Sequence, residues 1–327
     1  MLRVRVCDDR DECRAVWARA WPRASLFDLW EVRACFDEAF DRPPYFLVAE
    51  RDGAQVGVLA LSRLAETGEL AQFPGETWQG RTWLEGNRVP ARDPAALRAL
   101  IEAAPAGTEV RYLLPEALAG GASAALDEIG YLFHRPATED PFASYLALFS
   151  GKSRKRLGRE LEGLAAQGLA FRHDHLPDVE QLVRLNRDGF GARSFFADPR
   201  FLGGFERLVA WLRARGALRV TTALIGGAVA AVDVGATWGA DHWVFAGGTD
   251  PAFPGIAKAI NFHHVEWACA ARLDSVDFLC GDFGWKSRFH LTPRPLYCLT
   301  LPGAPRPVTV GHPAAAATVS ASTAVAC

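Results

Sequence analysis

Apolar and polar residues follow two different periods along this chain, and the period changes many times between the two termini. Alternating or short apolar runs predict strands at residues 2–6, 45–50, 56–64, 109–114, 131–134, 144–149, 169–172, 219–224, 229–238, 242–247, 276–279 and 296–301, with a further pair within 69–85. Helical spacing of apolar residues predicts helices at 9–20, 26–40, 94–103, 122–129, 153–168, 178–188, 199–215 and 256–272. The pattern indicates an α/β (α+β) protein.

The order of the predicted elements in residues 1–149 is repeated in residues 150–301. The predicted hairpins carry the clearest similarity, because DGAQVGVLAL from Asp52 resembles GGAVAAVDVG from Gly226. We interpret this as a duplicated unit and expect two mixed-sheet units in tandem. Residues 302–327 are rich in proline, alanine, serine and threonine and almost uncharged, which predicts a disordered tail and leaves the role of Cys327 open.

Composition narrows the classes of protein that the chain can be. The formal net charge of −2 gives no global basic footprint, so any contact with nucleic acid must be local. No apolar run is long enough to cross a bilayer, and the N-terminus has no signal-peptide core. The seven cysteines form no CxxC pair, which argues against a disulfide framework. We therefore expect a cytoplasmic protein with free thiols and no membrane span, and the oligomeric state stays open.

Several segments together resemble a known family. They are the basic opening SGKSRKRLGRELEGLAAQG, the hairpin at 223–234, the loop at 247–258 and DFLCGDFGWKSRFHLTPRPLY from Asp277 to Tyr297. The order of elements resembles the GNAT acyltransferase fold twice, and residues 150–301 resemble the acetyltransferase domain of the CelD type, related to the FemAB aminoacyl transferases. The resemblance implies tandem GNAT domains, an N-terminal half at 1–149 and a catalytic half at 150–301.

The loop DPAFPGIAK at 250–258 is a candidate site for the phosphates of a cofactor. Unpaired N–H groups and the dipole at a helix N-terminus favour anions. The candidate cofactor-binding residues are Asp250, Pro254, Gly255, Ile256, Ala257 and Lys258. The loop departs from the full glycine-rich pyrophosphate pattern of acetyl-CoA enzymes, and an ordinary strand-to-helix loop is the alternative.

The helix after this loop carries two neighbouring histidines. His263 falls on an apolar stripe with Ile256 and Ile260, which favours a core histidine. We expect Asn261 and His264 on a more polar face, where they would contact substrate. The spacing does not match HExxH, so we expect no metal.

The run GDFGWKSRF at 281–289 concentrates polar and aromatic residues after a strand. Functional residues gather where strands end in open α/β sheets. Asp282 could receive a proton from an amine nucleophile, and Lys286 could stabilise negative charge on the tetrahedral intermediate. Trp285 and Arg288 would contact substrate. A structural ion pair on a surface turn is the alternative.

The predicted helix at 153–168 opens with a cluster of cations, Lys152, Arg154, Lys155, Arg156 and Arg159. Cations in the first turns of a helix oppose its dipole, and an anionic partner would relieve that conflict. CoA phosphates, a nucleotide sugar or the acceptor end of a tRNA are possible partners, and Lys152, Lys155 and Arg156 are the candidate contacts. A solvated basic face is the alternative.

The resemblance implies an N-acyltransferase that moves an acyl group from acyl-CoA (acetyl-CoA) to a small-molecule or peptide amine by direct attack. The first half would then shape the acceptor cleft. FemAB-like aminoacyl transfer from aminoacyl-tRNA is a second hypothesis, which the basic helix favours. A degenerate GNAT tandem that binds a ligand without catalysis is a third.

Overall fold

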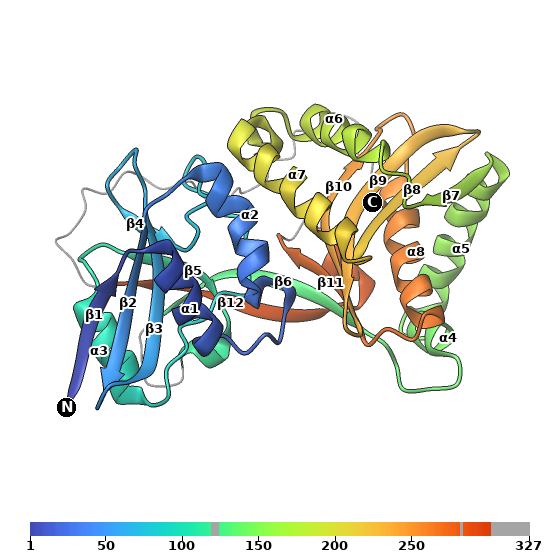
Figure 1. Cartoon of the computed structure of the whole chain (residues 1–327). Helices are drawn as coiled ribbons and strands as arrows, with labels where there is room; N and C mark the ends of the chain where they lie inside the picture. Colours follow the sequence, from blue (N-terminus) through green and yellow to red (C-terminus); the bar gives the residue numbers. More distant parts are fainter. Residues whose placement is uncertain (119–123, 282–283, 302–327) are drawn as a thin grey trace.

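The computed structural model describes residues 1–118, 124–281 and 284–301 (Figure 1). Asp282, the predicted tail at 302–327 and Cys327 lie outside the described residues. The first part of the chain contains β1 (Leu2–Cys7), α1 (Arg10–Ala20), α2 (Trp30–Phe40), β2 (Pro44–Arg51), β3 (Ala54–Arg63), β4 (Leu70–Gln72), α3 (Pro94–Ala103), β5 (Glu109–Leu113), β6 (Ala125–His134) and α4 (Pro141–Leu146).

The second part begins with the basic helix. It contains α5 (Gly151–Ala166), β7 (Leu169–His173), α6 (Asp178–Phe190), α7 (Pro199–Ala214), β8 (Leu218–Ile225), β9 (Ala228–Trp238), β10 (Asp241–Thr249), α8 (Ile256–Ala270), β11 (Ser275–Cys280) and β12 (Thr292–Thr300). Local sequence explains many of the boundaries. The Asp93 carboxylate accepts the N–H of Ala96 and Pro94 takes the first position of α3, while Asp198 and Pro199 open α7 in the same way.

All the strands join one mixed sheet in the order β1-β2-β3-β4-β5-β12-β6-β11-β10-β9-β8-β7. Each half of this order contains one parallel pair of neighbouring strands, β4 with β5 in the first half and β10 with β11 in the second. The other neighbouring strands are antiparallel. This mirrored order confirms two mixed-sheet units in tandem.

The two units exchange strands at the centre of the sheet. β12, from the end of the chain, pairs with β5 and β6, while β6 pairs with both β12 and β11. Figure 1 shows β6 and β12 crossing the middle of the molecule between the halves. The proposed domain division between residues 149 and 150 therefore does not divide the sheet, and it stays a prediction about domains.

Four of the predictions about elements differ from the structure. Residues 125–129 of the helix expected at 122–129 form the start of β6, because the central place of β6 in the sheet outweighs the helix propensity of its alanines and acidic residues. Residues 122 and 123 lie outside the described residues. The strand expected at 144–149 overlaps α4, which begins at Pro141 with Asp140 as its N-cap. The helix expected at 26–40 is a short 3₁₀ turn followed by α2, with extended backbone at Leu29 between them. The pair expected within 69–85 contains one strand of the described sheet, β4.

Helices cover both faces of each half. In the second half, Ala231 packs toward α5 and α8, whereas its neighbours Val232 and Val234 pack toward α6 and α7. In the first half, α3 covers Leu47 and Leu59, and α1 covers the opposite face. The strand period of two thus places alternate residues of a strand in two different cores.

The two halves also meet through α2 and α7, which lie side by side between them (Figure 1). A Cβ atom on Gly204 of α7 would lie 2.7 Å from the Phe36 ring of α2, so only glycine permits this approach. Trp83, from the first half, contacts Phe201, Phe205 and Phe245 of the second half. This shared aromatic core holds the 77–85 segment against the second half of the sheet.

Candidate functional site

The parallel strands β10 and β11 part soon after they begin. They pair only from Asp241 to Trp243 on β10 and from Ser275 to Asp277 on β11. The register of β10 against β9 then shifts between Val244 and Ala246, which bends β10. Beyond this point the two strands are no longer paired with each other, and the carbonyls of Phe278, Leu279 and Cys280 on β11 take another partner.

Lys286 lies at the end of β11 and is buried, with 2 % of its surface exposed. Its Nζ donates hydrogen bonds to the carbonyl oxygens of Phe278, Leu279 and Cys280, at 2.7, 2.9 and 2.8 Å. Successive carbonyls of a regular strand point in opposite directions, so three that converge on one ammonium require a local break. Leu279 supplies it with a φ of 57°, in the left-handed region. Lys286 therefore holds the end of β11 in its parted conformation.

The loop at 250–255 joins β10 to α8. The Asp250 carboxylate accepts a hydrogen bond from the N–H of Ala252 at 2.9 Å, and the backbone carbonyl of Asp250 accepts one from the N–H of Phe253. Gly255 has a φ of 88°, which favours glycine, and it precedes α8 without a side-chain cap. The first turn of α8 therefore begins beside a loop that Asp250 shapes, and within it the Ile256 N–H already donates to the Phe253 carbonyl at 3.2 Å.

Lys258 forms an ion pair with Glu160 of α5. Its ammonium is thus already neutralised by a carboxylate in this structure. α5 and α8 pack antiparallel, because Leu164 approaches Gly255 while Leu157 packs in the same core as Phe262. This direction places the cationic opening of α5 toward the C-terminal half of α8, away from the 250–255 loop.

The basic cluster does not converge on the loop. Lys152, Lys155 and Arg156 are exposed on α5, and Arg156 lies 3.8 Å from Glu160. Trp285 packs on Phe278 and Phe289, whereas Arg288 is exposed. The candidate contacts with substrate therefore occupy separate surfaces.

Asp233 and His264 form a buried pair beneath α8. The Asp233 carboxylate on β9 lies 2.9 Å from Nε2 of His264, and both side chains are nearly inaccessible. Burial disfavours the charged form of each group. It raises the pKa of Asp233 to about 7 and lowers the pKa of His264 to about 3. One proton shared along this bond leaves the pair without net charge.

The faces expected for the two histidines were wrong. His264 is buried against β9, and His263 is only half-buried, stacked on the rings of Phe171 and His173 of β7. Asn261 donates to the carbonyl of Ala257 one turn earlier. The sheet covers one side of α8, and α5 covers another side. The hydrophobic pattern of α8 therefore does not reveal which of its residues face the sheet and which face α5.

A second buried network joins the two halves at the end of β11. Glu85 Oε1, from the first half, accepts the N–H of Cys280 at 2.6 Å. Arg294 of β12 bonds Asp277 Oδ2 at 2.6 Å and lies 3.4 Å from Glu85 Oε2. Burial, reinforced by Asp277, raises the pKa of Glu85.

Sequence reasoning missed Glu85, Asp233, Asp277 and Arg294. A signal was present for two of them, because Asp233 and Asp277 are single acids inside otherwise apolar strands. An acid in such a place must have a partner or be protonated. Glu85 and Arg294 carry no comparable local signal.

In the described part of the chain, no group of histidine, cysteine and acidic residues could hold a metal ion. No helix there is long and apolar enough to span a bilayer. Cys7, Cys13, Cys35, Cys269, Cys280 and Cys298 are unpaired.

Residues 151–287 match the family model of the acetyltransferase (GNAT) domain. No curated protein matches the sequence at a significant level. Among solved structures, FemX is similar over 91 % of this chain and 97 % of its own, with 10 % identity and a TM-score of 0.56.

Two further structures have a similar fold. The L-PGS of Bacillus licheniformis is 12 % identical over 91 % of this chain and 93 % of its own, with a TM-score of 0.55. A conserved protein of unknown function from Bacteroides thetaiotaomicron is 15 % identical over 91 % and 100 %, also with a TM-score of 0.55. The chain therefore has a FemX-like fold of two GNAT units in tandem.

Proposed function

We propose that the chain is an N-acyltransferase that moves an acyl group from acyl-CoA to the amine of a small molecule or peptide. The observation that carries this proposal is the parting of β10 from β11, next to the Gly255 loop and within the segment that matches the acetyltransferase domain. Past the point of parting, the edge of β10 that faced β11 would offer backbone donors and acceptors to an extended amide-bearing chain such as the arm of CoA, whereas the carbonyls at the end of β11 are bonded to Lys286.

The residues divide the work in the following way. The backbone N–H of Ala257 binds a phosphate oxygen, assisted by the dipole of α8, whereas the N–H of Ile256 is bonded to the Phe253 carbonyl. Asp282 receives the proton of the attacking amine. Lys286 acts mainly as a positioning residue, because three strand carbonyls hold its ammonium. The amine attacks the thioester carbonyl directly, and the CoA thiolate leaves.

Aminoacyl transfer from aminoacyl-tRNA is the second candidate. The exposed cations of α5 favour it, because Lys152, Lys155 and Arg156 form a surface suited to a phosphate backbone. The ion pair between Lys258 and Glu160 also favours this second candidate. Because Glu160 already pairs with the ammonium of Lys258, this lysine is less suited to bind a CoA phosphate at the loop.

The two donors can be separated by binding and turnover. Acetyl-CoA and an aminoacyl-tRNA are titrated separately, and thiol release is then followed with a panel of amines. We expect acetyl-CoA to bind and amines to stimulate thiol release. Binding of the tRNA alone would establish the second candidate, and acetyl-CoA binding without turnover on any amine would indicate a binding module.

A pair of glycine variants tests the loop itself. Gly255→Ala places a side chain at a φ of 88° with only Leu164 nearby, and should weaken acetyl-CoA binding. Gly53→Ala is the matched control, because Gly53 has a φ of 81° in the first hairpin and an equally open surrounding. Equal affinity in both variants would remove the loop from the proposed site.

A further inference from the structure

Side chains take over the backbone hydrogen bonds of β11 once its pairing with β10 ends at Asp277. The N–H of Leu279 donates to the Asp277 carboxylate at 2.9 Å. The N–H of Cys280 donates to Oε1 of Glu85 at 2.6 Å. The carbonyls of the same strand end accept hydrogen bonds from Lys286. Because a buried backbone group needs a partner, these three side chains together stabilise a strand end that β10 no longer pairs with.

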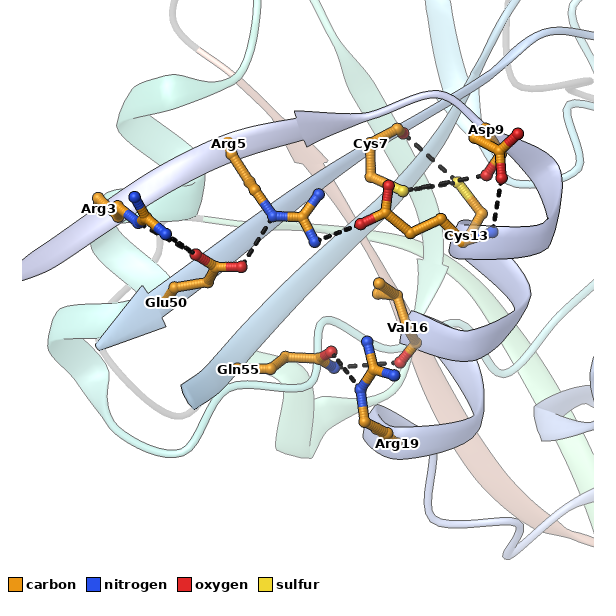
Figure 2. A network of polar contacts seen from close by, with 10 residues as sticks. Arg3, Arg5, Cys7, Asp9, Cys13, Val16, Arg19, Glu50 and Gln55 are labelled. Atoms are coloured by element: carbon orange, nitrogen blue, oxygen red, sulfur yellow. Dashed lines mark hydrogen bonds and ion pairs between the residues drawn. The ribbon is translucent and has the colours of Figure 1, made fainter. Parts of the chain in front are cut away.

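Glu85 is the one of these three side chains that comes from the first half of the chain. Its carboxylate is enclosed, with 3 % of the side chain exposed, and its Oε2 lies 3.4 Å from Nη2 of Arg294 on β12. Glu50 of β2 shows a different arrangement, because it binds Arg3 and Arg5 of the neighbouring strand β1, both at 2.8 Å (Figure 2). Glu50 thus pairs within its own half, whereas the hydrogen bonds of Glu85 end on β11 and β12.

Residues 83–85 contact both of the strands that part. The ring of Trp83 packs edge-on against Phe245 of β10, with the ring centroids 5.8 Å apart. Phe245 lies at the register shift of β10, past the last residue that pairs with β11. Two residues after Trp83, Glu85 accepts the N–H of Cys280 on β11. One short segment of the first half therefore contacts each strand just beyond their last pair.

Arg294 fixes the carboxylate of Glu85 in this place. The same guanidinium binds Asp277 Oδ2 at 2.6 Å, so it lies between two acids that would otherwise repel each other. It crosses the central strand β6 at Gly130, where a Cβ atom would lie 3.0 Å from Nη2 of Arg294. Strands from the centre of the sheet thus hold Glu85 in the orientation that reaches β11.

We propose that Glu85 is a positioning residue for the acyl-transfer site, through which the first half of the chain sets the opening between β10 and β11. By holding the N–H of Cys280, Glu85 keeps the strand end in the conformation whose carbonyls reach Lys286. The segment that matches the acetyltransferase domain, residues 151–287, then depends on a side chain outside it for the shape of its own site. This inference rests on the proposed function, since it assigns the opening to acyl-CoA.

Two substitutions in the full chain test the hydrogen bond. Glu85→Leu removes the acceptor, whereas Glu85→Gln keeps an oxygen that can accept the N–H of Cys280. In Glu85→Leu we expect the Cys280 amide to exchange with solvent at least roughly tenfold faster, and acetyl-CoA to bind at least roughly tenfold more weakly. Glu85→Gln should restore most of both properties. Hydrogen exchange followed by NMR and calorimetry with acetyl-CoA measure them.

Glu50→Leu is the control, because it removes a bonded carboxylate of the same half that lies on β2, away from β11. It should leave the exchange of Cys280 and the affinity for acetyl-CoA unchanged. Wild-type exchange and affinity in Glu85→Leu, or equal losses in Glu85→Leu and Glu50→Leu, would overturn the proposal. If the wild type does not bind acetyl-CoA, the proposed function fails instead, and the exchange of Cys280 alone decides whether Glu85 positions the strand end.

Discussion

In each half of the molecule, one pair of parallel strands separates after a short pairing, but different structures lie beside the two openings. In the second half, the 250–255 loop leads directly into α8, and Lys286 fixes the end of β11. In the first half, no helix follows β4 until α3 begins at Pro94, and a pocket occupies the opening. A helix N-terminus suits an anion, whereas the arginines that line this pocket already form ion pairs with carboxylates.

The duplicated hairpins show the same divergence at single residues. When the hairpins are aligned at their turns, Leu59 of β3 corresponds to Asp233 of β9. Leu59 packs beneath α3 in an apolar core, whereas Asp233 pairs with His264 beneath α8. A duplicated fold has therefore kept an ordinary core on one side and acquired a buried titratable pair on the other.

The largest effect should follow from removing the ammonium that parts β11 from β10. Lys286→Met keeps most of the side-chain volume but leaves three strand carbonyls, two of them buried, without this donor. At about 1–3 kcal/mol for each buried unsatisfied group, we expect a loss of at least about 2 kcal/mol in the free energy of unfolding. Urea denaturation measures this, and turnover should fall with it.

Lys155→Met is the matched control, because Lys155 is exposed on α5. Its unfolding free energy should stay within about 0.5 kcal/mol of wild type. If Lys286→Met were as stable as this control, Lys286 would not hold the strand end, and its interpretation as a positioning residue would be wrong.

The second prediction converts Asp233 into its first-half counterpart. In Asp233→Leu, His264 is the one member of the pair whose pKa remains shifted, with a folded pKa of about 3 against an ordinary value of 6.5. The unfolded state then binds more protons between these values, so stability should rise from pH 3 to 6.5, by up to about 1.4 kcal/mol per unit.

The wild type should show a much flatter profile between about pH 4 and 6.5. The Asp233 pKa is raised from 3.8 to about 7, so the folded state binds the extra proton and this contribution falls as pH rises. The two slopes oppose each other. Unfolding of wild type, Asp233→Leu and the double variant with His264→Leu, measured at unit steps of pH, checks this. If the unfolding free energy of Asp233→Leu depended on pH no more strongly than that of the double variant, the pairing of Asp233 with His264 would be wrong.

The smallest effect on stability should come from the basic helix. Replacing Lys152, Lys155 and Arg156 with alanine should change the unfolding free energy by no more than about 0.5 kcal/mol, because all three side chains are exposed. It should weaken binding of aminoacyl-tRNA in a salt-dependent manner. Replacing the exposed first-half residues Arg14, Arg92 and Arg98 provides the control, and equal affinities of both triple variants at low salt would reduce the cluster to a solvated face.

The sequence by itself determined the local elements and their repetition. Alternation predicted both hairpins, and Gly53, Gly226 and Gly227, which all have positive φ, mark their turns. The glycine before α8 was also predictable, because an unusual backbone angle selects for it. These features depend on neighbours within a few residues, so they are written in local patterns.

Only the tertiary structure decided the centre of the sheet and the polar networks. The 125–134 segment is a strand because β11 and β12 both pair with it, and neither is near it in sequence. Glu85 reaches the N–H of Cys280, 195 positions away along the chain. Lys286 looked like a catalytic cation, and its three bonds to β11 became visible only once the strand end was folded around it. Hydrogen bonds between distant segments leave no periodicity in the sequence, and for that reason no local pattern could predict them.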